Sequence, residues 1–102
     1  MQRARQIGQQ EAVIVHLSFV QLPEEFWQLN DRLYELLEQN GAGEFDGNEI
    51  GGGEATLFAY GPDARRLFSV MEPLLRSYPV CQNARVVIRK GGPGSPQTEV
   101  QL

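Results

Sequence analysis

Cysteine and histidine are almost absent from this chain of 102 residues, which contains one of each, Cys81 and His16. A single cysteine cannot form an internal disulfide, and nothing accompanies it at the spacing of a metal site. We therefore expect no metal and no cofactor. The lack of disulfides is typical of a reducing compartment, and we expect the protein to be cytoplasmic.

Long apolar runs and an excess of positive charge are also missing. The apolar segment from Ala12 to Leu17 is far shorter than the roughly 20 residues of a membrane helix, and too short for the core of a signal peptide. Lysine and arginine together number 9 against 13 aspartates and glutamates, a net charge of −4. Because an acidic chain is poorly suited to bind a phosphate backbone, we expect neither nucleic acid nor membrane as a partner.

The chain does have the composition of one globular domain, with 41% hydrophobic and 22% charged residues. From Glu11 to Val20 the residues alternate in the period-two pattern of a strand with one dry face. Pro23 and two acids then open a helix with a single apolar stripe, and Asn40-Gly41 ends it. We place the domain at residues 11–90, between a flexible arm at 1–10 and a flexible tail at 91–102.

The segment after this helix is rich in glycine and has two interpretations. Residues 44–50 could form a short edge strand with a bulge at Gly47, followed by a turn at Gly51-Gly52-Gly53. Alternatively, Asp46-Gly47 could itself be a hairpin turn.

Three clearer elements follow the glycine-rich segment. Residues 54–60 and 84–89 alternate as strands, and an apolar stripe over 64–78 predicts a second helix with a kink or break at Pro73. The order strand, helix, strand, strand, helix, strand predicts an α+β fold of the ferredoxin-like β-α-β-β-α-β type. Its four-stranded antiparallel sheet would carry both helices on one face, with the first and third strands in the centre.

The same alternation predicts what the other face of the sheet carries. The residues expected there are Ile14, His16, Ser18, Val20, Thr56, Phe58, Tyr60, Arg85, Val87 and Arg89. A face with so many apolar side chains is unsuited to water, and contiguous apolar surface of this kind marks an interface. We expect a homodimer formed through the sheet, and hence a non-enzymatic protein-interaction or regulatory module.

A ligand platform is the competing interpretation of this face. Phe58 and Tyr60 would stack on the ligand while Arg85 or Arg89 holds an anion, and a small-molecule sensor or minor enzyme would be built around His16. Binding of a partner protein in the manner of an immunity protein is a further alternative. On the first helix, Trp27 and Tyr34 lie outside the apolar stripe and are expected to pack against the glycine-rich segment rather than contact a partner.

Three segments carry a resemblance to a group of small uncharacterised bacterial single-domain proteins. They are Phe45-Asp46-Gly47-Asn48-Glu49-Ile50, Thr56-Leu57-Phe58-Ala59-Tyr60-Gly61-Pro62-Asp63-Ala64 and Glu72-Pro73-Leu74-Leu75-Arg76. That group has no established activity, so the resemblance implies a bacterial single-domain protein and no mechanism. Asp46 and Glu49 match the acidic pair of the group, which makes them the candidate residues of a polar loop.

Overall fold

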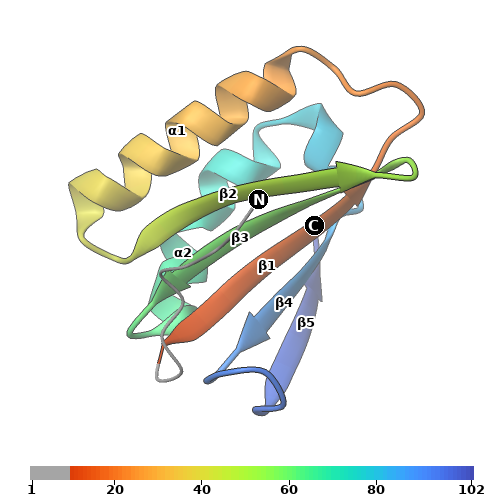
Figure 1. Ribbon diagram of the computed structural model, residues 1–102. Helices are drawn as coiled ribbons and strands as arrows, with labels where there is room; N and C mark the ends of the chain where they lie inside the picture. The colour runs from red at the N-terminus through yellow and green to blue at the C-terminus, as the bar shows by residue number, and fades with distance from the viewer. Residues whose placement is uncertain (1–9) are drawn as a thin grey trace.

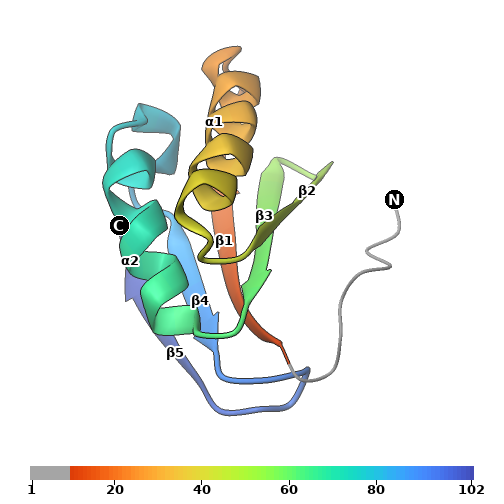
Figure 2. The same ribbon diagram turned by 90° about the vertical axis from the view of Figure 1, so that its left-hand side faces the viewer.

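The computed structural model describes residues 10–102, so most of the arm expected at 1–10 lies outside the described residues. Along the chain the elements are β1 (Glu11–Ser18), α1 (Glu25–Asn40), β2 (Glu44–Gly51), β3 (Glu54–Gly61), α2 (Ala64–Arg76), a 3-10 turn (Pro79–Cys81), β4 (Arg85–Arg89) and β5 (Gln97–Gln101). The strands form one antiparallel sheet in the order β2-β3-β1-β4-β5. Figures 1 and 2 show α1 and α2 on the same side of this sheet, as expected for the α+β class.

The sheet has five strands, and the prediction of four was wrong. β5 lies within the segment expected to be a tail and pairs with β4 from Arg85 opposite Gln101 to Arg89 opposite Gln97. Val100 is the one apolar residue of β5, and it packs against the core while the other four are exposed. The pattern gave no strand signal because an edge strand is held mainly by backbone hydrogen bonds and needs little apolar surface.

The two helices begin and end for local reasons that the sequence contains. Gly41 follows α1 with a left-handed φ of 60°, which glycine adopts without strain. At the start of α2 the Asp63 carboxylate accepts hydrogen bonds from the backbone N–H groups of Arg65 and Arg66. The helix then runs through Pro73 to Arg76, so of the two outcomes expected there, a kink or a break, the break does not occur. The missing N–H of Pro73 costs one hydrogen bond in the final turn, which leaves the rest of the helix intact.

The core lies between the helices and the sheet, and the predicted inward residues are confirmed. Those that point under the helices and are buried are Val13, Val15, Leu17, Ala55, Leu57, Ala59, Val86 and Ile88. They meet the buried stripes of α1 and α2, which include Phe26, Leu29, Leu33, Leu67 and Met71. The other face of the sheet, which we call the open face, has no helix over it in the described part of the chain.

β2 is an edge strand with a bulge, and the alternative of a hairpin turn at Asp46-Gly47 was wrong. Its pairing with β3 shifts between Phe45 and Asn48, and Gly47 has a φ of 94° in the bulge. The turn to β3 is made by Gly52 and Gly53, both with positive φ.

Where β2 begins and β3 ends, Gly43 and Gly61 approach closely. A Cβ atom on Gly43 would overlap the carbonyl oxygen of Tyr60, and one on Gly61 would stand 2.5 Å from that of Ala42.

Candidate functional site

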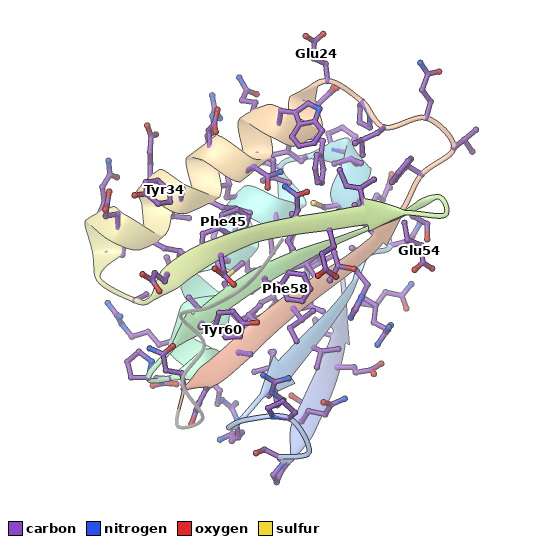
Figure 3. All side chains as sticks on the ribbon, in the orientation of Figure 1. Glu24, Tyr34, Phe45, Glu54, Phe58 and Tyr60 are labelled. Atoms are coloured by element: carbon purple, nitrogen blue, oxygen red, sulfur yellow. The ribbon has the colours of Figure 1, made fainter. Side chains whose placement is uncertain are left out.

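An apolar belt crosses the middle of the open face. The register sets Ile14 of β1 directly between Phe58 of β3 and Val87 of β4. Phe58 and Ile14 are half-buried and Val87 is buried. In Figure 3 the Phe58 and Tyr60 side chains lie on the side of the sheet turned toward the viewer, away from the helices. The belt is therefore a contiguous apolar strip three strands wide.

Polar residues lie at the two ends of this belt. At one end the register aligns Thr56, His16 and Arg85, and the Thr56 Oγ1 lies 3.4 Å from the His16 Nδ1. At the other end it aligns Tyr60, Ala12 and Arg89. The two rows are four positions apart along β1, from Ala12 to His16, which corresponds to about 13 Å at the rise of a strand. The structure thus brings His16 to Arg85, but it does not bring either of them to Tyr60 or Arg89.

The open face exposes less apolar surface than the sequence pattern predicted. Tyr60 is only 4% exposed, and Val20 lies beyond the end of β1, where it is fully exposed. The large apolar side chains exposed among residues 10–102 are Val20, Trp27, Tyr34 and Ile50, none of which is on the belt. The alternation correctly indicated the direction of each side chain but not its exposure, because neighbours on a flat sheet cover one another's flanks.

Charges of opposite sign flank the belt. Arg85 and Arg89 belong to β4, and Glu44 and Glu49 of β2 lie opposite Tyr60 and Thr56 on the same face. Arg85 also donates to the Glu99 carboxylate of β5 at 3.1 Å, where both side chains are half-exposed, so this pair adds little stability. The open face therefore has an acidic margin at β2 and two arginines on β4, with Glu99 of β5 beside Val87 on the same face.

The surroundings of His16 hold its imidazole in the neutral form. Burial lowers the pKa of His16 below its usual 6.5, the charge of Arg85 lowers it further, and Glu54 and Glu99 oppose this shift. His16 lines a cavity of about 390 Å³ together with Leu17, Ser18, Glu54, Gln82, Asn83 and Arg85. These side chains suit the binding of a small polar molecule. Ser18 is exposed at the end of β1, and within residues 10–102 no hydrogen bond links it to His16 to activate its hydroxyl.

A second hollow lies between α1 and β2, and we call it the α1–β2 groove. Its volume is about 510 Å³, and its lining comprises Trp27, Asn30, Asp31, Tyr34, Phe45, Asp46, Gly47 and Asn48. Figure 3 shows Tyr34 on α1 and Phe45 on β2 at its two sides. Trp27 and Tyr34 line this hollow together with residues of β2, and they remain 49% and 53% exposed, so the expected packing against the glycine-rich segment leaves about half of each ring uncovered.

An amide pair forms the polar floor of this groove. Asn30 is nine-tenths buried, and its Nδ2 donates to the backbone carbonyl of Phe26 at 2.8 Å. Its Oδ1 accepts a hydrogen bond from the Asn48 Nδ2 at 2.9 Å. This contact ties the first helix to the bulge of β2 across 18 residues of sequence. Sequence reasoning missed both asparagines, since an amide on a helix and one on a strand give no signal until the fold brings them together.

The candidate polar loop is divided between the two surfaces. Asp46 belongs to the α1–β2 groove, whereas Glu49 lies opposite Thr56 at the margin of the open face.

The chain matches no family model, no curated protein and no solved structure. Its function must therefore be inferred from these surfaces alone.

Proposed function

We propose that this protein is a non-enzymatic protein-interaction module of the cytoplasm that self-associates as a homodimer through the open face of its sheet. The observation that carries the proposal is the belt of Phe58, Ile14 and Val87, flanked by an acidic margin on one side and the two arginines of β4 on the other. Twofold dimers are the commonest assemblies of soluble proteins, and their interfaces must be self-complementary.

The acidic residues of β2 and the arginines of β4 favour one arrangement of the dimer. A twofold axis parallel to the strands and passing between β1 and β3 lays the β2 margin of each copy over the β4 strand of the other. Ile14 then faces Phe58 of the second copy, and Arg89 faces Glu44. A twofold axis perpendicular to the strands would place like charges together, which costs several kcal/mol at an interface. Sheets packed face to face in this way lie about 10 Å apart with nearly aligned strands.

The fold is consistent with this use of the sheet. We propose that α1, α2 and the first four strands form a ferredoxin-like core, supported by the neighbour order β2-β3-β1-β4 and by both helices lying on one face. β5 extends that sheet beyond β4. Among the described residues no helix is long and apolar enough to cross a membrane.

Light scattering coupled to gel filtration at micromolar concentration tests the dimer. We expect the wild type to have the mass of two chains and Ile14→Lys to have the mass of one, because a lysine in the belt would be buried without a partner. Ser18→Lys, on the same strand but beyond the belt, is the matched control and should remain dimeric. A monomeric wild type would overturn the proposal.

A charge exchange tests the orientation of the two copies. Arg89→Glu sets a new carboxylate against Glu44 of the other copy, and Glu44→Arg sets two guanidinium groups together, so each variant alone should dissociate. An equimolar mixture should form a heterodimer, since the two exchanged charges then face each other with opposite signs. If the mixture stays monomeric while the wild type dimerises, the twofold axis does not run along the strands.

The cavity at His16 favours a second candidate function, a small-molecule sensor. The Arg85 guanidinium, the Asn83 amide and a neutral imidazole line it together with the Glu54 carboxylate, and the first two can donate hydrogen bonds to a small anion. Acetate and inorganic phosphate are simple probes. Specific shifts of the His16 ring resonances that disappear in Arg85→Gln would favour the sensor, and their absence would eliminate this candidate for anions of that size.

A further inference from the structure

Carboxylates and aromatic rings alternate along one exposed line of α1. The line consists of Glu24, Trp27, Asp31, Tyr34 and Glu38, at spacings of three, four, three and four residues. Residues at this spacing lie above one another on a single helix face, and all five are exposed. We call this line the α1 stripe. In Figure 3 its first residue, Glu24, stands at the start of α1, and Tyr34 lies near the other end.

The stripe is negative, and α1 itself places no cation on it. The single basic residue of α1, Arg32, lies on a different side of the helix, where it lines a separate hollow with Glu35, Leu36, Gln39 and Leu74. The α1–β2 groove runs along the stripe, and its lining contains neither lysine nor arginine among the described residues. A ligand on this surface would therefore meet carboxylates and aromatic rings, and the described part of the chain places no lysine or arginine in the lining of the groove.

The groove beside the stripe is built to receive flat side chains. Gly47 contributes no side chain at the bulge, and the Asn30–Asn48 amide pair closes the floor. The rings of Trp27 and Phe26 pack nearly perpendicular to each other, with centroids 5.0 Å apart and planes at 84°, and the Trp27 side chain remains half-exposed at the groove. Trp27 and Tyr34 thus stand at the groove as half-exposed rings on the same helix face.

We propose that the α1 stripe and the α1–β2 groove bind an arginine-rich segment of a partner protein. A guanidinium group stacks on an aromatic face and pairs with a carboxylate at the same time, which no other side chain does as well. A metal ion is a poor occupant, because Glu24, Asp31 and Glu38 are each seven residues apart, about 10.5 Å along a helix, and cannot share one ion. An apolar helix would bury the same carboxylates unpaired.

The spacing of the stripe also defines the pattern that it would select. A peptide in the polyproline II conformation has three residues per turn and advances about 3.1 Å per residue, so every third side chain lies on the same side at intervals of about 9.3 Å. This repeat is close to the interval of about 10.5 Å between the carboxylates of the stripe. Three arginines separated by two small residues would meet Glu24, Asp31 and Glu38 in turn. The rings of Trp27 and Tyr34 lie between these carboxylates and would cover the arginine stems.

The experiment uses a synthetic peptide that contains three arginines at every third position, separated by glycine and serine. Trp27 is the only tryptophan of the chain, so its fluorescence reports binding directly. We expect saturable binding to the wild type that weakens at least fivefold in Asp31→Asn and in Tyr34→Ala. Glu25→Gln removes the same charge from the side of α1 that carries Arg32, seven residues further along the helix, and it should change the affinity less than twofold.

Two further measurements separate recognition from general charge attraction. A peptide with its three arginines adjacent has the same charge but the wrong spacing, and a lysine version has the right spacing without a planar head. Both should bind more weakly than the spaced arginine peptide. Equal affinity for all three peptides, or equal losses in Asp31→Asn and Glu25→Gln, would overturn the proposal, as would no binding to the wild type. Circular dichroism of each variant establishes that it is folded.

Discussion

The contact between Gly43 and Gly61 gives a sharp test of the fold, because the strand β2 offers its own control. At Gly43 an added methyl group would overlap the carbonyl oxygen of Tyr60, an atom of the backbone of the neighbouring strand. That oxygen cannot rotate away as the end of a flexible side chain would. Gly51, at the other end of β2, has nothing within 4 Å of the position where a Cβ atom would stand.

The expected free energies of unfolding differ accordingly. Gly43→Ala must separate the start of β2 from the end of β3, and overpacking of this kind costs about 3 kcal/mol when no side chain can yield. Gly51→Ala meets no neighbour and restricts the unfolded chain, which stabilises a protein by up to about 1 kcal/mol. The stability of a domain of this size is about 5–15 kcal/mol, so the first change is a large fraction of the total.

Urea unfolding followed by circular dichroism measures the difference. With a urea dependence of about 1.5 kcal/mol per M, Gly43→Ala should lower the unfolding midpoint by about 2 M, while Gly51→Ala leaves it unchanged or slightly higher. Gly61→Ala, whose Cβ would stand 2.5 Å from the Ala42 carbonyl oxygen, should resemble Gly43→Ala. Equal midpoints for the variants at Gly43 and Gly51 would show that β2 and β3 do not approach each other as described.

Two titration experiments follow from the environments of His16 and Cys81. Arg85→Gln should raise the pKa of His16 and Glu54→Gln should lower it, both measured on the single histidine ring by NMR. Since the folded pKa is lower than the unfolded one, the unfolded state binds the proton more tightly, and stability should fall as the pH drops below about 6.5. Burial raises the pKa of Cys81 to about 11, so a disulfide reagent at about pH 8 should modify the folded protein at least roughly 100-fold more slowly than the urea-unfolded protein.

The interior of the fold could be predicted because its elements have strong periodicity. β1 and β3 alternate over their whole length, so the burial of Val13, Val15 and Leu57 followed from the pattern alone. The end of the first helix could also be predicted, since Gly41 adopts the left-handed conformation that stops a helix. In these segments local preference and tertiary burial favour the same structure.

The positions of the edge strands depend on backbone pairing with their neighbours rather than on the hydrophobic pattern of the sequence. β5 has a polar sequence, and its place beside β4 follows from backbone hydrogen bonds that no periodicity encodes. The exposure of Tyr60 on the open face, 4%, was likewise beyond the pattern, which specifies a direction and not a neighbour. The α1 stripe is the opposite case. The spacing of its residues can be read from the sequence. The sequence does not show that β2 lies beside the stripe and forms a groove with it.

The two proposed surfaces can operate together because they lie on opposite sides of the sheet. Association through the open face would leave both helical layers outside, and a twofold axis along the strands would turn the two α1 stripes away from each other. Such a dimer would be bivalent toward a partner with two arginine-rich segments. Joining two weak sites raises the overall affinity by roughly 10²–10⁴-fold when the linker can span them. Ile14→Lys should therefore abolish the advantage of a two-segment peptide and leave the affinity for a one-segment peptide unchanged, a separation that neither surface would produce alone.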